Sequence, residues 1–198
     1  LHDDPELATW WQVFRADGLA GLPAQRHAEI TLQAHIGERR LIAKYDLLAL
    51  EPGGEAVIVD WKTWRRVPEQ SYLQGRLQTI LYRTVLAKAG AHLYGGPIPP
   101  ERIRMVYCFV AQGGQRLSID YSADQMREDE SYLRALIESV DGAQQFPLTD
   151  DESLCRFCTY RSLCERGAAG SLELLDMEDE LEEEDYTLDF DQIAEIEF

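Results

Sequence analysis

Two apolar runs on either side of a tight turn constrain the fold of this 198-residue chain more than any other feature. Residues 41–50 and 57–63 are rich in β-forming side chains, and Pro52-Gly53-Gly54 between them is a strong turn signal. The pattern predicts an antiparallel hairpin. Because side chains alternate faces along a strand, Asp60 and Lys62 should project to the same side.

The position of the turn also predicts which residues face each other across the hairpin. If the turn is centred near Gly53, antiparallel pairing places Asp46 opposite Asp60 and Lys44 opposite Lys62. A slip of one residue would move Asp46 to the other face. In the first register, two carboxylates and a lysine meet on one patch of the sheet.

Such a patch suits the hydrolysis of a phosphate ester. Mg²⁺ prefers oxygen ligands and often lies between protein carboxylates and a substrate phosphate, where it polarises the phosphate and acidifies a water. It also removes the repulsion between two close carboxylates. Lys62 could orient the water or stabilise developing negative charge. The simpler interpretation is an Asp60–Lys62 ion pair at a strand end, with Asp46 a surface residue.

A helix is predicted over residues 69–89, closed by Gly90. Its apolar residues follow helical spacing, and Gln74, Gln78 and Tyr82 form a polar stripe four residues apart beside them. An ordinary amphipathic helix with a solvated face would show the same pattern.

In this order, the motifs resemble the RecB-like branch of the PD-(D/E)XK nuclease superfamily, which includes the nuclease domains of RecB and AddB and the CRISPR-associated iron–sulfur nucleases. The resemblance covers roughly residues 25–167, and the ordered set is far more specific than any single motif. The segments that carry it are Ala28-Glu29-Ile30, Ala43-Lys44-Tyr45-Asp46, Ile58-Val59-Asp60-Trp61-Lys62-Thr63, Gln78-x-x-x-Tyr82 and Cys155-x-x-Cys158-(x5)-Cys164.

The resemblance implies an α/β (α+β) restriction-endonuclease-like core, in which helices flank a central mixed β-sheet and a cysteine-cluster segment follows. It also assigns roles. Asp46, Asp60 and the main-chain carbonyl of Trp61 would hold Mg²⁺ or Mn²⁺, and Lys62 would be the catalytic lysine. Gln78 and Tyr82 would position the nucleic-acid strand or the charges of the site.

The roles of one glutamate, Glu29, and one histidine, His27, remain open. Glu29 is either an additional acidic residue of the site or an exposed strand residue. Similar nucleases carry a metal-binding histidine on a helix before these strands, and nothing before Glu29 has that helix context. His27 lies in a predicted strand, one residue out of phase with its neighbours, and so does not fit this role. Because the chain opens at Leu1, we expect that a preceding N-terminal segment is absent from it.

Three of the four cysteines are close in sequence: Cys155, Cys158 and Cys164. No secretory signal precedes them, so this spacing favours a metal or a cluster over disulfides. A [4Fe–4S] cluster needs four thiolates, and no cysteine occurs before Cys108, which has the pattern of a core thiol. A Zn²⁺ site of three cysteines and one histidine, or three reduced thiols without metal, are the alternatives.

The net charge of −17 is concentrated at the C-terminus. Residues 171–198 hold thirteen Asp or Glu and no Lys or Arg, which leaves −4 for residues 1–170 and their 19 basic side chains. We therefore expect a nuclease domain over residues 1–167 and an acidic tail over 168–198. The tail is either a disordered solubilising segment, or it docks on a protein partner or covers a basic groove.

The resemblance implies a metal-dependent DNA nuclease that hydrolyses phosphodiester bonds. Its substrate would be single-stranded DNA or DNA ends, in repair, recombination or antiviral defence. The alternative is a non-catalytic nucleic-acid-binding or scaffolding module that retains the nuclease fold. Trp61 and Trp64 would stack on bases or pack in the core. No run approaches the length of a membrane-spanning helix, and a cytoplasmic location is expected.

Overall fold

The computed structural model describes residues 5–155, 158 and 160–167. The chain divides into two compact units, Leu1–Ala143 and Gln144–Phe198. The predicted acidic tail, residues 168–198, lies outside the described residues. Each unit is treated separately below.

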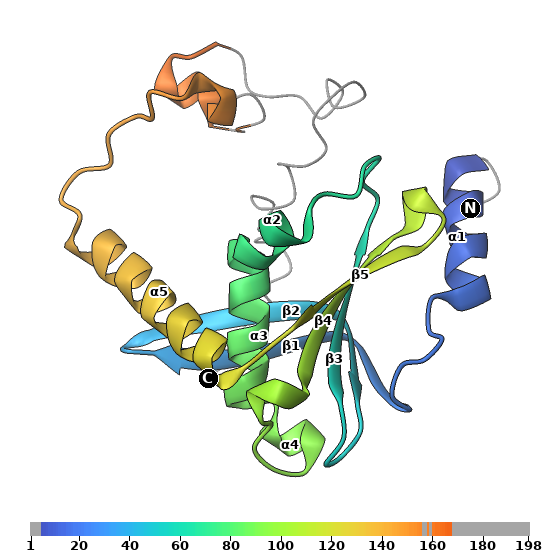
Figure 1. The fold of residues 1–198 in the computed structure, drawn as a ribbon. Coiled ribbons are helices and arrows are strands. Elements are labelled where there is room, and N and C mark those ends of the chain that lie inside the picture. The colour runs from blue at the N-terminus through green and yellow to red at the C-terminus, as the bar shows by residue number, and fades with distance from the viewer. Residues whose placement is uncertain (1–4, 156–157, 159, 168–198) are drawn as a thin grey trace, which may run out of the picture. The chain divides into compact units, whose positions relative to one another are not determined.

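The first unit is built on a five-stranded mixed sheet in the order β1-β2-β3-β4-β5 (Figure 1). Neighbouring strands are antiparallel except β3 and β4, which are parallel and are joined through three helices. Crossovers of this kind are how parallel neighbours are connected. The strands are β1 (Gln25–Ile36), β2 (Arg39–Leu50), β3 (Ala56–Lys62), β4 (Ile103–Phe109) and β5 (Gln115–Asp120).

The predicted turn between β2 and β3 is present. Gly53 has a φ of 75°, which glycine adopts at little cost, and the Gly54 amide donates to the Glu51 carbonyl at 2.8 Å. The turn fixes a register in which Leu47 faces Val59 and Leu50 faces Ala56. This is the register predicted from the sequence.

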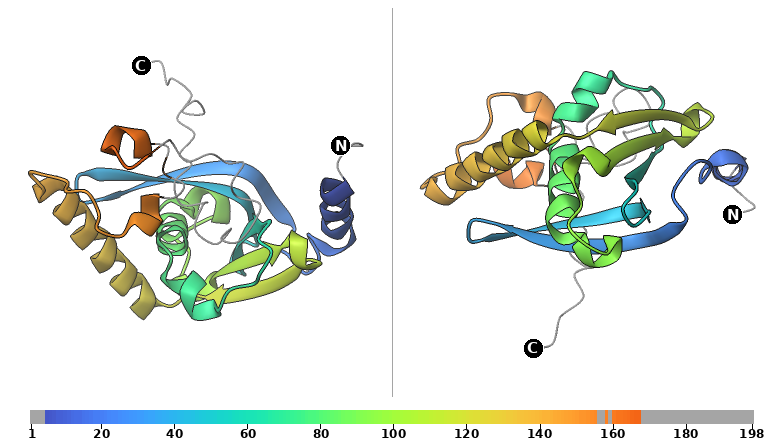
Figure 2. Two further views of the ribbon diagram at one scale, coloured as in Figure 1. Left: turned by 90° about the horizontal axis from the view of Figure 1, so that it is seen from above. Right: turned by 60° about the horizontal axis from the view of Figure 1, so that its bottom comes forward.

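Helices cover the sheet unequally. The helices are α1 (Pro5–Asp17), α2 (Gln70–Gly75), α3 (Leu77–Ala89), α4 (Ala91–Tyr94) and α5 (Ala123–Gly142), with short 3₁₀ turns η1 (Pro100–Arg102) and η2 (Val110–Gln112). α3 crosses one face of the sheet and α5 packs beside it, whereas α1 lies at the opposite end of the sheet from α5 (Figure 2). The Ser122 side chain caps α5 by accepting from the main-chain N–H of Gln125.

The two faces of β3 have different characters. Val57, Val59 and Trp61 point to an apolar cluster with residues of β2 and β4, which Leu19 and Leu22 cover. Residues of the other parity, among them Asp60 and Lys62, face α3. The strand alternation predicted from the sequence therefore holds.

Near Asp46, the alternation of side chains along β2 shifts, so that residues of the same parity point to opposite faces of the sheet. Leu47 packs in the apolar cluster with Val59, but Tyr45, two residues away, contacts α3 on the opposite side through the ring of Tyr82. Opposite this point, Glu29 of β1 has a left-handed φ of 52°, which is rare for a residue with a side chain. Strict alternation would have kept Tyr45 and Leu47 on one face. At the outer end of the hairpin, Ile36 and Leu41 pack with Ile80 of α3 and Leu133 of α5.

The single helix predicted over residues 69–89 is wrong in one respect. Arg76 is extended (φ −67°, ψ 141°) and separates α2 from α3. Gly75 before it weakens the helix, and the Thr79 hydroxyl donates to the Leu73 carbonyl at 2.5 Å across the break. The break turns the Arg76 side chain, which is only 6% exposed, into the protein.

The described part of the second unit contains two 3₁₀ turns, η3 (Glu152–Cys155) and η4 (Arg161–Cys164). Among the described residues, no helix is long and apolar enough to cross a membrane. The predicted fold class is confirmed in the first unit: an α/β arrangement in which helices flank a mixed central sheet.

Candidate active site

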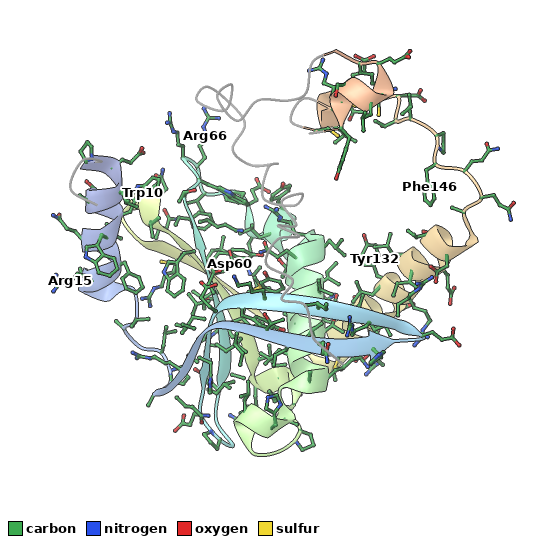
Figure 3. The ribbon with its side chains drawn as sticks, turned by 180° about the vertical axis from the view of Figure 1, so that it is seen from behind. Trp10, Arg15, Asp60, Arg66, Tyr132 and Phe146 are labelled. Carbon is green, nitrogen blue, oxygen red and sulfur yellow. The ribbon has the colours of Figure 1, made fainter. Side chains whose placement is uncertain are left out.

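Three side chains from β3 and α3 form a closed polar network. The ammonium group of Lys62 lies 3.1 Å from Asp60 Oδ2 and donates to Gln78 Oε1 at 3.3 Å. The amide of Gln78 in turn donates to Asp60 Oδ1 at 3.0 Å. Asp60 and Lys62 are both buried, and the network lies between the central strands and α3 (Figure 3). Burial of a charged pair is expensive unless further hydrogen bonds complete it, and Gln78 supplies them to both partners.

Asp46 reaches this network from β2. Regular pairing between β2 and β3 ends at Leu47 and Val59, and one step further Asp46 Oδ2 accepts the main-chain N–H of Trp61 at 2.9 Å. The structure thus brings Asp46 beside the segment that carries Asp60, as the turn predicted. Lys44, expected opposite Lys62, instead forms a surface ion pair with Glu29 at 3.0 Å.

Tyr107 of β4 lies beside the polar network. It pairs with Asp60 in the parallel register, and its hydroxyl lies 2.6 Å from the Thr79 hydroxyl. Because the single proton of Thr79 goes to the Leu73 carbonyl, Tyr107 is the donor in that contact. Burial, and secondarily the charge of Asp60, raise the pKa of Tyr107, so it stays a neutral donor throughout the physiological range.

Trp64 joins the network to the break between α2 and α3. Lys62 Nζ lies 5.3 Å from the centre of the Trp64 ring, and Arg76 Cζ lies 4.9 Å from it. Arg76 Cζ also lies 5.8 Å from the ring of Tyr72. Cations within about 6 Å of an aromatic ring are attracted to its face. A column of alternating rings and cations therefore runs from Tyr72 to Lys62.

Tyr82, predicted to position the strand or the charges, contacts β2. Its ring centre lies 4.9 Å from that of Tyr45, and its main-chain carbonyl accepts the Tyr45 hydroxyl at 2.9 Å. Desolvation raises the pKa of Tyr45, so this hydroxyl remains a donor. Tyr82 therefore links α3 to β2 close to Asp46, and its direct role at the site stays a prediction.

Glu29 and His27 do not join the network through any contact among residues 5–155. The exposed Glu29 carboxylate is bonded to Lys44, and the His27 ring is within hydrogen-bonding distance of the Gln25 amide at 3.1 Å. A role for Glu29 in the site stays a prediction.

The oxygen donors around Asp60 fit a hard divalent cation. Within the part of the chain that the structure describes, no three His, Cys, Asp or Glu side chains are grouped to hold a metal. Mg²⁺, however, commonly takes only one or two protein carboxylates, with water and substrate phosphate completing its shell. Asp46 and Asp60 meet that lower requirement.

The cysteine segment of the second unit does not form a metal centre in the described residues. Cys155, Cys158 and Cys164 are free and half-buried, and they are not grouped closely enough to hold an ion. Cys155 Sγ accepts from Arg166 at 3.3 Å, and this hydrogen bond raises the pKa of Arg166. Neither the [4Fe–4S] cluster nor the Zn²⁺ alternative gains support from this arrangement. Cys108, in contrast, is buried in the core, as its strand pattern indicated.

Of the two tryptophans expected to stack on bases or to pack, Trp64 is 1% exposed and packs inside the protein. Trp61 is half-buried against the apolar cluster and lies edge-on to Phe14 of α1 at 5.5 Å. Sequence reasoning missed Tyr107, Thr79 and the Tyr72–Arg76 end of the column. The parallel register of β4 and the helix break determine these positions, and neither leaves a clear local signal.

A family model for the PD-(D/E)XK nuclease superfamily matches residues 6–165. A search of curated proteins found no match.

Two solved structures are similar to this chain at low identity. SSO0001 matches with a TM-score of 0.46 and 15% identity, over 80% of this chain and 66% of its own. A provisionally assigned exonuclease from Eubacterium rectale matches with a TM-score of 0.42 and 9% identity, over 72% of this chain and 62% of its own. The chain thus spans less than two thirds of the length of either protein, and neither likeness identifies an activity.

The family match covers most of the chain and includes both strands and the helix that form the polar network. The matched range contains two carboxylates from adjacent strands, Asp46 and Asp60, and Lys62 on the same face of β3 as Asp60. The chain belongs to the PD-(D/E)XK nuclease superfamily.

Proposed function

We propose that the protein is a Mg²⁺- or Mn²⁺-dependent deoxyribonuclease of the RecB-like branch that hydrolyses phosphodiester bonds. Its substrate is single-stranded DNA or a DNA end, and its setting is repair, recombination or antiviral defence in the cytoplasm. The observation that carries the proposal is the closed network of Asp60, Lys62 and Gln78 next to Asp46.

A local ion pair has little value for the fold, which favours a catalytic explanation of this network. Asp60 and Lys62 lie two residues apart on one strand, so their contact joins no separate elements. Burying two charges costs several kcal/mol per ion in real proteins, by a rough estimate, before their attraction offsets it. A stability role alone does not account for that cost, whereas a reaction at a charged phosphate does.

The residues present divide the work of hydrolysis as follows. Asp46, Asp60 and the Trp61 carbonyl would hold the cation, which polarises the phosphate and lowers the pKa of a water. Lys62 donates to the developing negative charge on the phosphate oxygens or orients the attacking water. Gln78 holds Lys62 and Asp60 in register, so neither charge has to reorganise during the reaction.

End-labelled DNA incubated with the purified full chain tests the proposal. We expect cleavage of single-stranded DNA with Mg²⁺ or Mn²⁺ and none with a chelator. Asp60→Asn and Lys62→Met should each abolish cleavage while DNA binding is retained. The surface variant Lys44→Met, which removes the lysine exposed beside Glu29, is the matched control and should cleave normally. RNA of the same sequence, compared in parallel, decides between DNA and RNA.

The second candidate, a non-catalytic nucleic-acid-binding module with this fold, rests on the small number of metal ligands in the described residues. It predicts binding without cleavage under every metal tested. Metal-dependent cleavage that survives Asp60→Asn would contradict both candidates, because the activity would then come from another site or another protein.

Two finer expectations depend on this function and have tests of their own. A [4Fe–4S] cluster on Cys155, Cys158 and Cys164 would give anaerobically purified protein a broad visible absorbance, and colourless zinc-containing protein would reject it. Docking of the acidic segment 171–198 over a basic groove would make its deletion raise DNA affinity, whereas unchanged affinity would leave a protein partner or a solubilising tail as the remaining expectations.

A further inference from the structure

The segment after Lys62 carries features that the hydrolytic network does not use. Residues 63–69 connect β3 to α2, and this connection is fixed at two points. The first point is the side chain of Trp64, which is buried in the protein. The second is the Arg65 main-chain carbonyl, which accepts from the Gln112 side chain of η2 at 2.6 Å. Arg66, the next residue, is exposed. Figure 3 shows Arg66 on this connection, past the part of the chain that carries Asp60.

Tyr72 is the outer end of the ring and cation column. It is 45% exposed, whereas Trp64 and Arg76 beneath it are 1% and 6% exposed. The Tyr72 ring is backed by the Arg76 guanidinium, which is in turn packed on Trp64. An aromatic ring that is supported in this way is already ordered, so a ligand that stacks on it loses little conformational freedom.

The column connects this exposed ring to the proposed catalytic lysine. From Tyr72, each step is a single contact through Arg76 and Trp64 to Lys62, which lies against Asp60. We propose that Tyr72 and Arg66 bind unpaired DNA beside the hydrolytic site. Tyr72 stacks on a nucleobase, and Arg66 binds a neighbouring backbone phosphate.

This surface selects unpaired strands for a physical reason. A base can place its face on a side-chain ring only when that face is not covered by the next base of a duplex, and stacking tolerates any base because each has a π face. Arg66 contributes charge without sequence preference. The surface thus gives the proposed nuclease a preference for single strands or frayed ends without a recognition domain. The identification of the strand as DNA rests on the proposed function.

Binding measured without cleavage tests the inference. Fluorescence anisotropy of a labelled single-stranded oligonucleotide, with a chelator present, is compared with the same sequence as a blunt duplex. Tyr72→Ala should weaken single-strand binding by about tenfold and leave duplex binding unchanged, because base–aromatic stacking is lost. Tyr72→Phe keeps the ring and should bind like the wild type. Tyr132→Ala on α5 removes an equally accessible tyrosine, 49% exposed, and is the matched control.

Arg66 has a separate readout. Arg66→Ala should reduce the slope of log affinity against log salt by about 0.7 on single strands, as expected for one lost phosphate contact. Arg134→Ala, an exposed arginine on α5, should leave that slope unchanged. Thermal denaturation of each variant shows whether it is folded. If Tyr72→Ala does not fold, Tyr72→Phe still tests the inference, because loss of binding with the ring retained would contradict stacking.

The outcomes separate this inference from the proposed function. Single-strand affinity of folded Tyr72→Ala within about twofold of the wild type, or an equal loss on the duplex, overturns the stacking surface. Wild-type protein that binds through Tyr72 but never cleaves overturns the nuclease and leaves the surface intact. Protein that cleaves, but whose DNA binding is unchanged by both substitutions, overturns the surface and leaves the nuclease intact.

Discussion

Two buried ion pairs touch α3, and they have opposite structural meaning. Lys62 and Asp60 are 3.1 Å apart and Arg83 and Asp129 are 3.0 Å apart, all with side chains almost inaccessible to water. The first pair lies within one strand. The second joins α3 to α5 across 46 residues of sequence and is reinforced by Gln125. Equal burial and equal distance therefore do not indicate equal roles.

The difference between the pairs is what each one connects. Any extended strand would keep Asp60 and Lys62 close, so their contact specifies no tertiary arrangement. The Arg83–Asp129 contact exists only when α5 is docked, and the Arg83 guanidinium also lies 4.6 Å from the ring of Tyr121. We infer that the first pair is retained for chemistry and the second for the placement of α5.

The sharpest test of this contrast neutralises the whole first pair. Asp60→Asn with Lys62→Met should lower the cleavage rate by about a thousandfold or more, because the groups that stabilise developing charge are gone. The free energy of unfolding should change by less than about 1 kcal/mol, since replacing both partners of a buried pair is often nearly neutral. Single-turnover cleavage and urea denaturation measure the two quantities. A large loss of stability would show that the pair supports the fold after all.

Breaking the second pair should affect stability instead. Arg83→Met leaves the Asp129 carboxylate buried without its cation and should cost about 3 kcal/mol of unfolding free energy. Chemical denaturation measures the loss, and cleavage well below the melting temperature should be nearly unchanged. As a control, Arg83→Met combined with Asp129→Leu should regain most of the stability. Lost cleavage in that folded double variant would contradict the assignment.

Gln78 should have an intermediate effect on activity alone. Gln78→Leu removes the hydrogen bonds to Lys62 and Asp60, and a hydrogen bond to a charged group is worth about 2 kcal/mol, so we expect roughly a thirtyfold lower rate. A pH–rate profile distinguishes positioning from packing, because the profile should shift only if Gln78 holds the charged groups. Gln74→Leu, on α2 before the break at Arg76, is the matched control.

The smallest effect concerns pH. Burial raises the pKa of Asp129 above its ordinary value of 3.8, although Arg83 opposes the shift. The folded protein then binds this proton more readily than the unfolded chain, so the contribution of Asp129 to stability declines as pH rises from about 3.8 through the raised pKa. Asp129→Asn should lack this decline when unfolding is measured across that range. An identical pH dependence in the variant and the wild type would reject the raised pKa.

The hairpin that carries the site could be predicted because its information is local. Pro52, Gly53 and Gly54 fix the turn, and the turn fixes the register that brings Asp46 to the Trp61 amide. The position of Gln78 followed from the family pattern rather than from periodicity, since an amphipathic stripe does not reveal what it faces.

Features that depend on distant contacts could not be predicted. The Arg76 break occurs where Gly75 weakens the helix, but only the packing of Arg76 on Trp64 explains why the chain turns there. Tyr107 reaches the site through a parallel pairing whose register no short motif encodes. Likewise, Lys44 was expected opposite Lys62 under strict pairing, yet the strand changes face first and Lys44 contacts Glu29.

Because β2 changes face, the two halves of the β1–β2 hairpin pack in different clusters. Between Asp46 and the turn at Gly53, β2 shares a core with β3 and β4, whereas Ile36 and Leu41 at the far end of the hairpin pack with Ile80 of α3 and Leu133 of α5. Protection from amide exchange should follow these clusters rather than the strands themselves. We expect the outer hairpin to open together with α5 as one unit, while the inner half of β2 keeps Asp46 beside the polar network.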